Sequence, residues 1–101
     1  MITCHLRYVI DPYQLDAFEA YARVWPAIVN RLGGTHHGYF LPGEGANNIA
    51  LALFSFPSLA AYEQYRQAML ADPQAQAAMA EAEQNRCIVS VERSFFRPLS
   101  T

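Results

Sequence analysis

The order of apolar periodicities along this chain restricts its fold more than any other feature. A two-residue alternation, which is typical of a half-buried strand, runs over Ile2–Ile10 and returns over Arg86–Arg97. Two further strand-like stretches, Thr35–Leu41 and Asn48–Phe56, are separated by a short turn that is rich in glycine. Because this turn is short, we expect the two stretches to pair as an antiparallel hairpin.

The stretches between these strands show helical spacing. Apolar residues form one stripe over Tyr13–Leu32, and Pro26 inside it is expected to kink or split the helix. Ser58 is suited as the N-cap of a second helix, and Asp72 followed by Pro73 marks the start of a third, alanine-rich one. The expected inner positions of the second helix are Leu59, Tyr62, Tyr65, Arg66 and Met69.

These elements follow the order β-α-β-β-α-α-β in a chain of 101 residues, which is the size of one domain. Right-handed crossovers place the strands in the order four-one-three-two, with the helices on one face of the sheet. The sequence therefore predicts an α+β fold of the ferredoxin-like βαββαβ type, with an antiparallel sheet and a single domain over residues 1–101.

One face of such a sheet has no helices to cover it. The alternation assigns Val9, Phe96 and either Leu53 or Phe54 to that face. Charged residues make up only 16% of the chain, against 52% hydrophobic residues, so a monomer would expose much apolar surface. We therefore expect a homodimer in which two such sheets stack face to face.

Charge and composition exclude several classes of function. The formal net charge is −2, so no basic surface for nucleic acid is expected. The seven cations are all Arg, which excludes a Schiff-base lysine and a P-loop. No apolar run approaches the ~20 residues that span a bilayer, and the N-terminus has no signal-peptide pattern, so a cytoplasmic location is expected. Cys4 and Cys87 fall at opposite ends of neighbouring strands, so we expect both thiols to stay unbonded.

Two groups of polar residues are candidates for chemistry. The first consists of His5 and Arg7, which share one face of their strand, and Glu92, which antiparallel pairing brings opposite or near His5. A histidine beside a carboxylate can act as a general acid or base. The alternative is a cross-strand ion pair on the face between two subunits.

The second group lies in the second predicted strand. Neighbouring strand residues point to opposite faces, so His36 and His37 cannot chelate one metal ion together, and neither a metal nor a cofactor is expected. The alternation places His37 on the same face as Tyr39, where they could hold a small, largely apolar or aromatic ligand between sheet and helices. His5 is the second choice for this role. The alternative is that both neighbouring histidines are half-buried, hydrogen-bonded residues that complete the fold.

Several motifs resemble those of the NIPSNAP family. They are, in chain order, Gly33-Gly34, Gly38-Tyr39-Phe40, Ser58-Leu59-Ala60-Ala61-Tyr62-Glu63, Arg66, Asp72-Pro73 and Phe96-Arg97-Pro98-Leu99. Together they cover nearly the whole chain. The resemblance implies a dimeric α+β barrel, related in shape to small cofactor-free monooxygenases and isomerases, and it carries over no catalytic residues.

Two hypotheses for function follow from these residues. One is a small-molecule binder, or a cofactor-free monooxygenase- or isomerase-like enzyme, with a pocket between sheet and helices. The other is a non-catalytic dimeric interaction module. An apolar pocket with two or more convergent polar groups would favour the first hypothesis. A filled core in which His36 and His37 both bond to the backbone would favour the second.

Overall fold

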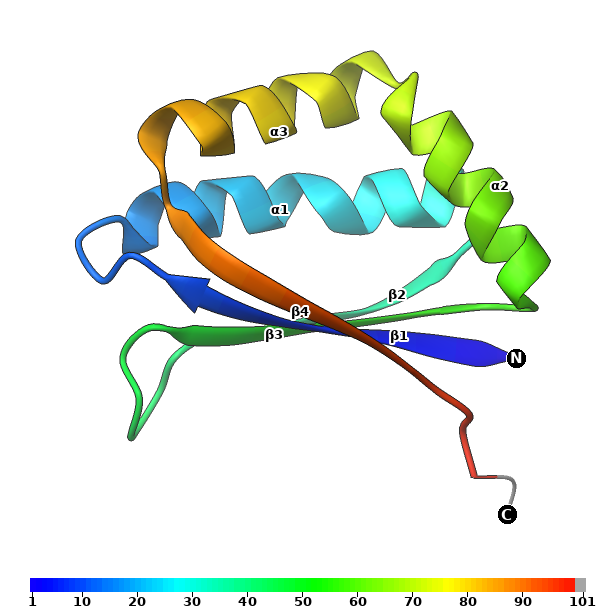
Figure 1. Ribbon diagram of the computed structural model, residues 1–101, viewed down its shortest axis with the longest axis horizontal. Helices are drawn as coiled ribbons and strands as arrows, with labels where there is room; N and C mark the ends of the chain where they lie inside the picture. The colour runs from blue at the N-terminus through cyan, green and yellow to red at the C-terminus, as the bar shows by residue number, and fades with distance from the viewer. Residues whose placement is uncertain (100–101) are drawn as a thin grey trace.

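The computed structural model describes residues 1–99 and contains four strands and three helices (Figure 1). In chain order these are β1 (Ile2–Ile10), α1 (Leu15–Arg31), β2 (Thr35–Phe40), β3 (Ile49–Phe56), α2 (Leu59–Leu70), α3 (Pro73–Asn85) and β4 (Ile88–Phe96). Strands and helices lie within one or two residues of the expected bounds, because the apolar periodicity changes at the turns. None of the helices in this part of the chain is both long and apolar enough to cross a membrane.

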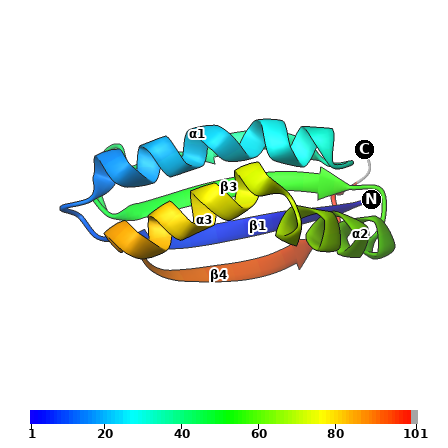
Figure 2. The same cartoon turned by 90° about the horizontal axis from the view of Figure 1, so that it is seen from above.

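The four strands form one antiparallel sheet in the order β2-β3-β1-β4. This is the predicted order, and it follows from two right-handed crossovers, one through α1 and one through α2 and α3. All three helices lie on the same side of the sheet, with α2 at one end of it (Figures 1 and 2). The α+β fold of the ferredoxin-like type is therefore confirmed.

Local capping chemistry starts the two later helices. The Oγ of Ser58 accepts a hydrogen bond from the N–H of Ala61 at 3.1 Å. A carboxylate oxygen of Asp72 accepts one from the N–H of Ala75 at 3.0 Å. Each cap satisfies a backbone donor that has no partner within the helix, and both predicted N-caps are confirmed.

Helix α1 contains Pro26 without a break (Figure 1). The prolyl nitrogen has no proton to donate to the carbonyl of Ala22, so one helical hydrogen bond is lost at this point. The buried stripe of the helix nevertheless continues from Trp25 to Ile28 on either side of the proline. Because packing of an apolar stripe supplies most of a helix's stability in a protein, the split expected from the sequence does not occur.

Strand β1 lies inside the sheet and alternates as predicted. Four of its side chains that face the helices are buried, namely Cys4, Leu6, Tyr8 and Ile10, and Ile2 at the start of the strand is half-buried. Cys4 pairs with Phe95, whereas Cys87 directly precedes Ile88, the partner of Ile10. The two thiols are therefore at opposite ends of the β1–β4 pair, and both are free, as predicted.

The pairing of β2 with β3 contains a β-bulge at His37. His36 and Gly38 lie opposite consecutive residues of β3, so His37 is an extra residue without a partner of its own. Gly38 has a φ of +125°, a backbone conformation that glycine adopts without strain. The extra residue reverses the alternation, so that His36, and not His37, shares the helix-covered face with Tyr39. The placement predicted for His37 is therefore wrong.

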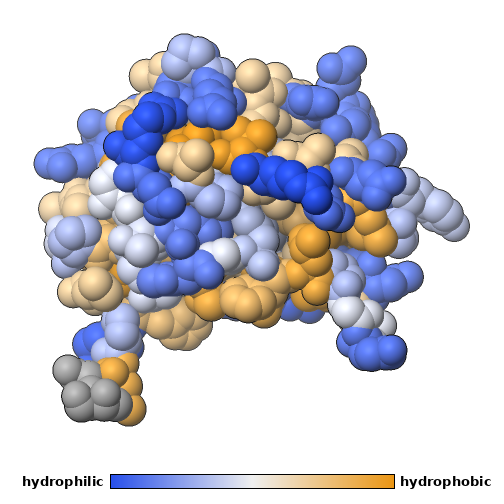
Figure 3. Space-filling view, turned by 180° about the vertical axis from the view of Figure 1, so that it is seen from behind, coloured by the Kyte–Doolittle hydropathy of each residue, from blue (hydrophilic) through white to orange (hydrophobic). Residues whose placement is uncertain are grey.

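The other face of the sheet has no helix over it (Figure 1). Figure 3 views the molecule from behind, with this face edge-on at the bottom, and shows hydrophobic side chains along the lower part and in a patch on the helix side above. Phe40 and Phe96, on the two edge strands, are 52% and 55% exposed, and Val9 and Leu53 lie half-buried between them. Phe54 instead faces the helices, which decides between the two residues proposed for β3.

Candidate functional site

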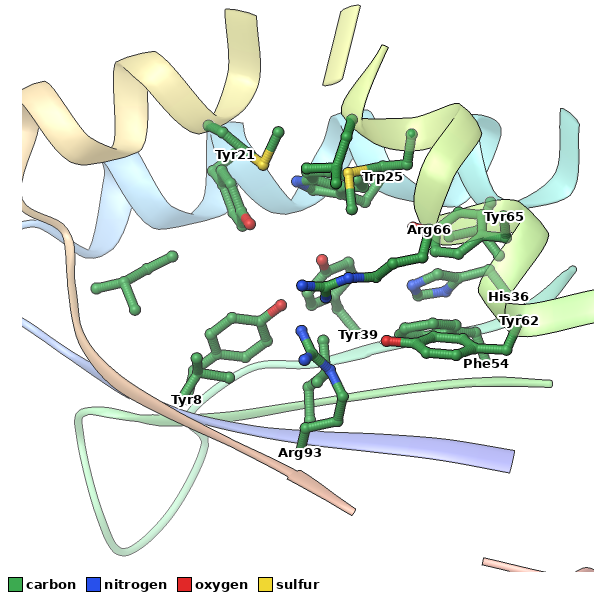
Figure 4. Close-up of a pocket in the computed structure, with 17 residues that line it drawn as sticks. Tyr8, Tyr21, Trp25, His36, Tyr39, Phe54, Tyr62, Tyr65, Arg66 and Arg93 are labelled. Atoms are coloured by element: carbon green, nitrogen blue, oxygen red, sulfur yellow. The ribbon is translucent and has the colours of Figure 1, made fainter. Parts of the chain in front are cut away.

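A cavity of about 260 Å³ lies between the sheet and the helices (Figure 4). Every strand and every helix contributes to its lining. Aromatic rings are the most prominent part of the wall, and five of them are tyrosines: Tyr8, Tyr21, Tyr39, Tyr62 and Tyr65. Pockets for drug-sized ligands measure roughly 300–1,000 Å³, so this cavity suits a molecule of one or two rings.

Helical periodicity aims many of these side chains at the cavity. Tyr62, Tyr65 and Arg66 lie three or four residues apart on α2 and share one face of the helix. Tyr21 and Trp25 do the same on α1. Leu59 stands in the first turn of α2 and is exposed, so its predicted inner position is wrong.

His36 is held as a neutral imidazole. The N–H of Gly38 donates to its Nδ1 at 3.0 Å, so Nδ1 carries no proton and Nε2 carries it. The ring stacks on Tyr39 and Phe54, with centroid distances of 5.1 and 5.5 Å. Burial, followed by the neighbouring His37, lowers the pKa of His36 to about 4. At neutral pH the side chain is therefore an uncharged hydrogen-bond donor.

Two buried N–H groups lack a well-aligned hydrogen-bond partner within residues 1–99. They are Nε2 of His36 and Nε1 of Trp25, and both residues line the cavity. The indole of Trp25 does approach the Tyr21 hydroxyl, where it opposes the rise in the pKa of that phenol, but the two groups do not form a hydrogen bond of good geometry. Trp25 is only 7% exposed. A buried donor left without a partner costs roughly 1–3 kcal/mol. These two groups are therefore ready to meet an acceptor atom of a ligand.

Four phenols of the cavity are donors and not bases at neutral pH. Burial raises the pKa of Tyr8, Tyr39 and Tyr65 above the usual range. Burial also raises the pKa of Tyr21, to about 12. Each hydroxyl keeps its proton, so these groups can orient a ligand oxygen or stabilise charge on it, and they are poorly suited to remove a proton.

Two arginines bring positive charge to the same cavity: Arg66 from α2 and Arg93 from β4 (Figure 4). The ion pairs of residues 1–99 involve Arg7, Arg23 and Arg31, and neither of these two. Among the described residues, no Asp or Glu lines the cavity. The polar part of the lining thus consists of N–H donors, phenol hydroxyls and positive charges, without a carboxylate.

Comparison with protein-family models identifies the family of this chain. The NIPSNAP model matches residues 5–101. The chain belongs to the NIPSNAP family. Among curated protein sequences, none matches this NIPSNAP chain significantly.

Solved structures share the fold of this NIPSNAP protein. A protein from Agrobacterium tumefaciens is 20% identical with a TM-score of 0.85, over 98% of this chain and 94% of that one. A NIPSNAP-like domain protein from Burkholderia xenovorans is 24% identical with a TM-score of 0.82, over 98% of this chain and 85% of that one. A proposed antibiotic biosynthesis monooxygenase from Nitrosomonas europaea is 6% identical with a TM-score of 0.78, over 99% of this chain and 100% of that one. These similarities show a common fold.

The bulge of β2 removes one predicted residue from the site of this NIPSNAP protein. His37 is exposed, and its Nε2 lies 2.7 Å from Oγ of Ser55, which is itself 2.8 Å from Oγ1 of Thr3. His37 therefore bonds to side chains outside the cavity, while His36 and Tyr39 lie together inside it. Within residues 1–99, no three His, Cys, Asp or Glu side chains are placed to hold a metal ion.

The first predicted group lies on the uncovered face of the sheet. Glu92 is opposite Arg7, not His5, with a nitrogen–oxygen distance of 3.8 Å. His5 is opposite Ser94, and its ring packs edge-on against Phe96 at a centroid distance of 5.8 Å. The structure therefore forms the cross-strand ion pair between Arg7 and Glu92 and does not place a carboxylate opposite His5.

The cavity residues that were not proposed as site residues from the sequence include Trp25, Arg66 and Arg93. A signal was present for each arginine, because a charged residue at an expected core-facing position is unusual. Arg66 falls among the inner positions of its helix, and Arg93 shares the alternation of Val91 on β4. Trp25 had a weaker signal, since a tryptophan on an apolar helical stripe is expected first as a core residue and only second as a platform for a ligand.

Proposed function

We propose that this NIPSNAP protein binds a small, largely aromatic or apolar molecule in the cavity, with an oxygen atom facing His36 and Trp25. The observation that carries this proposal is the pair of buried N–H donors without a partner on an aromatic wall. A ligand acceptor would remove the cost of leaving these donors unpaired. The rings would remove apolar ligand surface from water, which is worth roughly 25 cal/mol per Å².

The histidines favour binding over a purely structural interaction module. The hypothesis of an interaction module required a filled core in which the side chains of His36 and His37 both bond to the backbone. Only Nδ1 of His36 has a backbone partner, whereas its Nε2 is unpaired and His37 bonds to the side chain of Ser55. An apolar cavity with convergent polar groups is instead the arrangement typical of small-molecule sites.

A cofactor-free monooxygenase- or isomerase-like enzyme is the second candidate function. It is favoured by the fold shared with the proposed antibiotic biosynthesis monooxygenase of Nitrosomonas europaea. In such an enzyme, the donors of His36 and Trp25 would stabilise negative charge on a ligand oxygen. Binding is the better supported function, because the raised tyrosine pKa values and the occupied Nδ1 of His36 leave these groups unsuited as a base.

The single tryptophan allows a direct test of this binding site. Trp25 is the only tryptophan of the chain, so its indole N–H gives one resonance in a proton–nitrogen NMR spectrum. Titration with naphthol is expected to shift this resonance and to raise the melting temperature. Val91→Phe, which narrows the cavity, should weaken binding by about tenfold, which is about 1.4 kcal/mol.

Val89→Phe is the matched control, because Val89 lies on the same strand, is exposed and does not line the cavity. It should bind naphthol like the unmodified protein. The proposal is wrong if naphthol, naphthamide and naphthoate at millimolar concentration all leave the indole resonance and the melting temperature unchanged.

We also propose that the partner of this chain is a second copy of itself, bound through the uncovered face of the sheet. The exposed rings of Phe40 and Phe96 and the half-buried Leu53 support this arrangement. Sheets that stack face to face bury such side chains.

The cytoplasmic location expected from the sequence stays a prediction, which cell fractionation would test.

A further inference from the structure

We propose that the ligand of this cavity is a monoanion, namely an aromatic or apolar acid whose carboxylate lies between Arg66 and Arg93. The inference rests on the proposed function and specifies the chemical class of the ligand. It follows from the charge of the lining, the inventory of donors and the apolar character of the remaining wall.

The two arginines reach the cavity from different layers of the fold. Arg66 extends from α2, and Arg93 extends from β4 in the sheet (Figure 4). Arg93 lies opposite Leu6 in the β1–β4 pair, and Leu6 also lines the cavity. A guanidinium group from each layer can therefore contact the same small ligand.

No carboxylate of the described chain balances these two charges. Neither Arg66 nor Arg93 takes part in an ion pair within residues 1–99, and the lining described there includes no Asp or Glu. The positive charges of both arginines also act on Cys4. Burial raises the pKa of this thiol to about 11, and Arg93 and Arg66 oppose the rise. Two like charges beside an apolar cavity favour an anion from solution.

The neutral polar groups of the lining point to the same class of ligand. Nε2 of His36 and Nε1 of Trp25 are donors without a partner, and an indole N–H can never accept. A carboxylate has two oxygens with about four acceptor sites, and it fits the planar fork of an arginine. A neutral amide of the same shape has one acceptor oxygen and brings two donors of its own, which the arginines cannot accept.

The aromatic wall restricts what can carry the carboxylate. The rings of Tyr8, Tyr39 and Phe54 would contact the body of the ligand, and a cavity of about 260 Å³ holds one or two rings. A small inorganic anion would leave this apolar surface without contacts. The chemistry of the site therefore combines an acidic head with an apolar body.

Naphthoate and naphthamide form a matched pair that tests this inference. They have the same shape, and at about pH 7 only naphthoate is charged. We expect naphthoate to bind at least about tenfold more tightly, with the Trp25 indole resonance as the readout. Arg66→Gln and Arg93→Gln should each weaken naphthoate binding by about tenfold and change naphthamide binding by less than about threefold.

Arg23→Gln is the matched control, because it removes the same charge from an exposed position of α1. Arg23 pairs with Glu19 at 2.7 Å, and the variant should preserve the preference for naphthoate. The melting temperature without ligand checks folding. If Arg66→Gln does not fold, the exposed Arg93 still provides the test.

Each result decides the inference. Equal binding of the two compounds, or a preference for naphthoate that survives both cavity substitutions, overturns it while the proposed function stands. Failure of naphthol and of both compounds to bind overturns the proposed function as well.

Discussion

His36 links the stability of the protein to pH. Its pKa falls from 6.5 to about 4 on folding, chiefly because the ring is buried. Between these values the unfolded chain binds a proton that the folded protein does not, so the free energy of unfolding decreases as the pH falls through this window. Above the unfolded-state pKa of 6.5 the imidazole is neutral in both states, so none of this stability is lost there.

We therefore predict that His36→Gln loses less stability in acid than the unmodified protein does. Melting temperatures at about pH 7 and about pH 5 measure the effect. His5→Gln, on the opposite face of the sheet, serves as the control and should retain the acid-dependent loss due to His36. An equal loss in the His36→Gln variant and the unmodified protein would contradict the placement of this ring.

The two cysteines should be inert in the folded protein. Cys4 and Cys87 are both fully buried, and burial raises the thiol pKa of Cys4 from 9.0 to about 11. At neutral pH this lowers the thiolate fraction of Cys4 by about a hundredfold, and the thiolate is the reactive form. We predict that alkylation is at least about a hundredfold slower in the native than in the denatured protein.

Mass spectrometry of unreduced protein kept in air should likewise show two free thiols. A crosslink between Cys4 and Cys87 would contradict the strand order, because the two residues lie at opposite ends of the β1–β4 pair.

At the scale of the element, the bulge of β2 decides which histidine enters the cavity. Gly38 has a φ of +125° there, and a Cβ at this position would meet nothing within 4 Å. Any loss of stability in Gly38→Ala therefore reports backbone strain and not a steric clash. We predict a loss of about 1–2 kcal/mol in the free energy of unfolding, measured by denaturant titration.

Gly43→Ala provides the matched comparison. Gly43 also has open space around its Cα, but its φ lies outside the left-handed region. This variant should have nearly unchanged or slightly higher stability, since alanine restricts the unfolded chain. Equal stability of the two variants would contradict the prediction, because it would show that a Cβ at position 38 does not strain the backbone of the bulge.

At the scale of the whole molecule, the uncovered sheet face predicts the state of association. We expect light scattering at micromolar concentration to give twice the chain mass of 11.3 kDa. Phe96→Glu places a charge on an exposed apolar position of the proposed contact face, on the edge strand β4, so it should produce a folded monomer. Tyr13→Glu alters a residue that is 94% exposed in the loop before α1, and it should remain dimeric. A mass of 11.3 kDa for the unmodified protein would contradict the prediction.

Much of the fold could be predicted from the sequence, because its signals are local. The alternation of β1 and the caps at Ser58 and Asp72 depend on neighbouring residues alone. Right-handed crossovers then leave few possible orders for four strands. The motifs from Gly33-Gly34 to the C-terminus were enough for the family resemblance, which the match over residues 5–101 confirms.

The site depended on contacts that only the tertiary structure decides. Whether His36 or His37 faces the helices is set by a one-residue bulge, and a bulge is defined by the partner strand and not by local alternation. The pairing of Glu92 with Arg7 likewise depends on the register between strands at opposite ends of the chain. Arg66 and Arg93 were visible as charges in apolar patterns, but their convergence on one cavity arises only when α2 packs over the sheet beside β4.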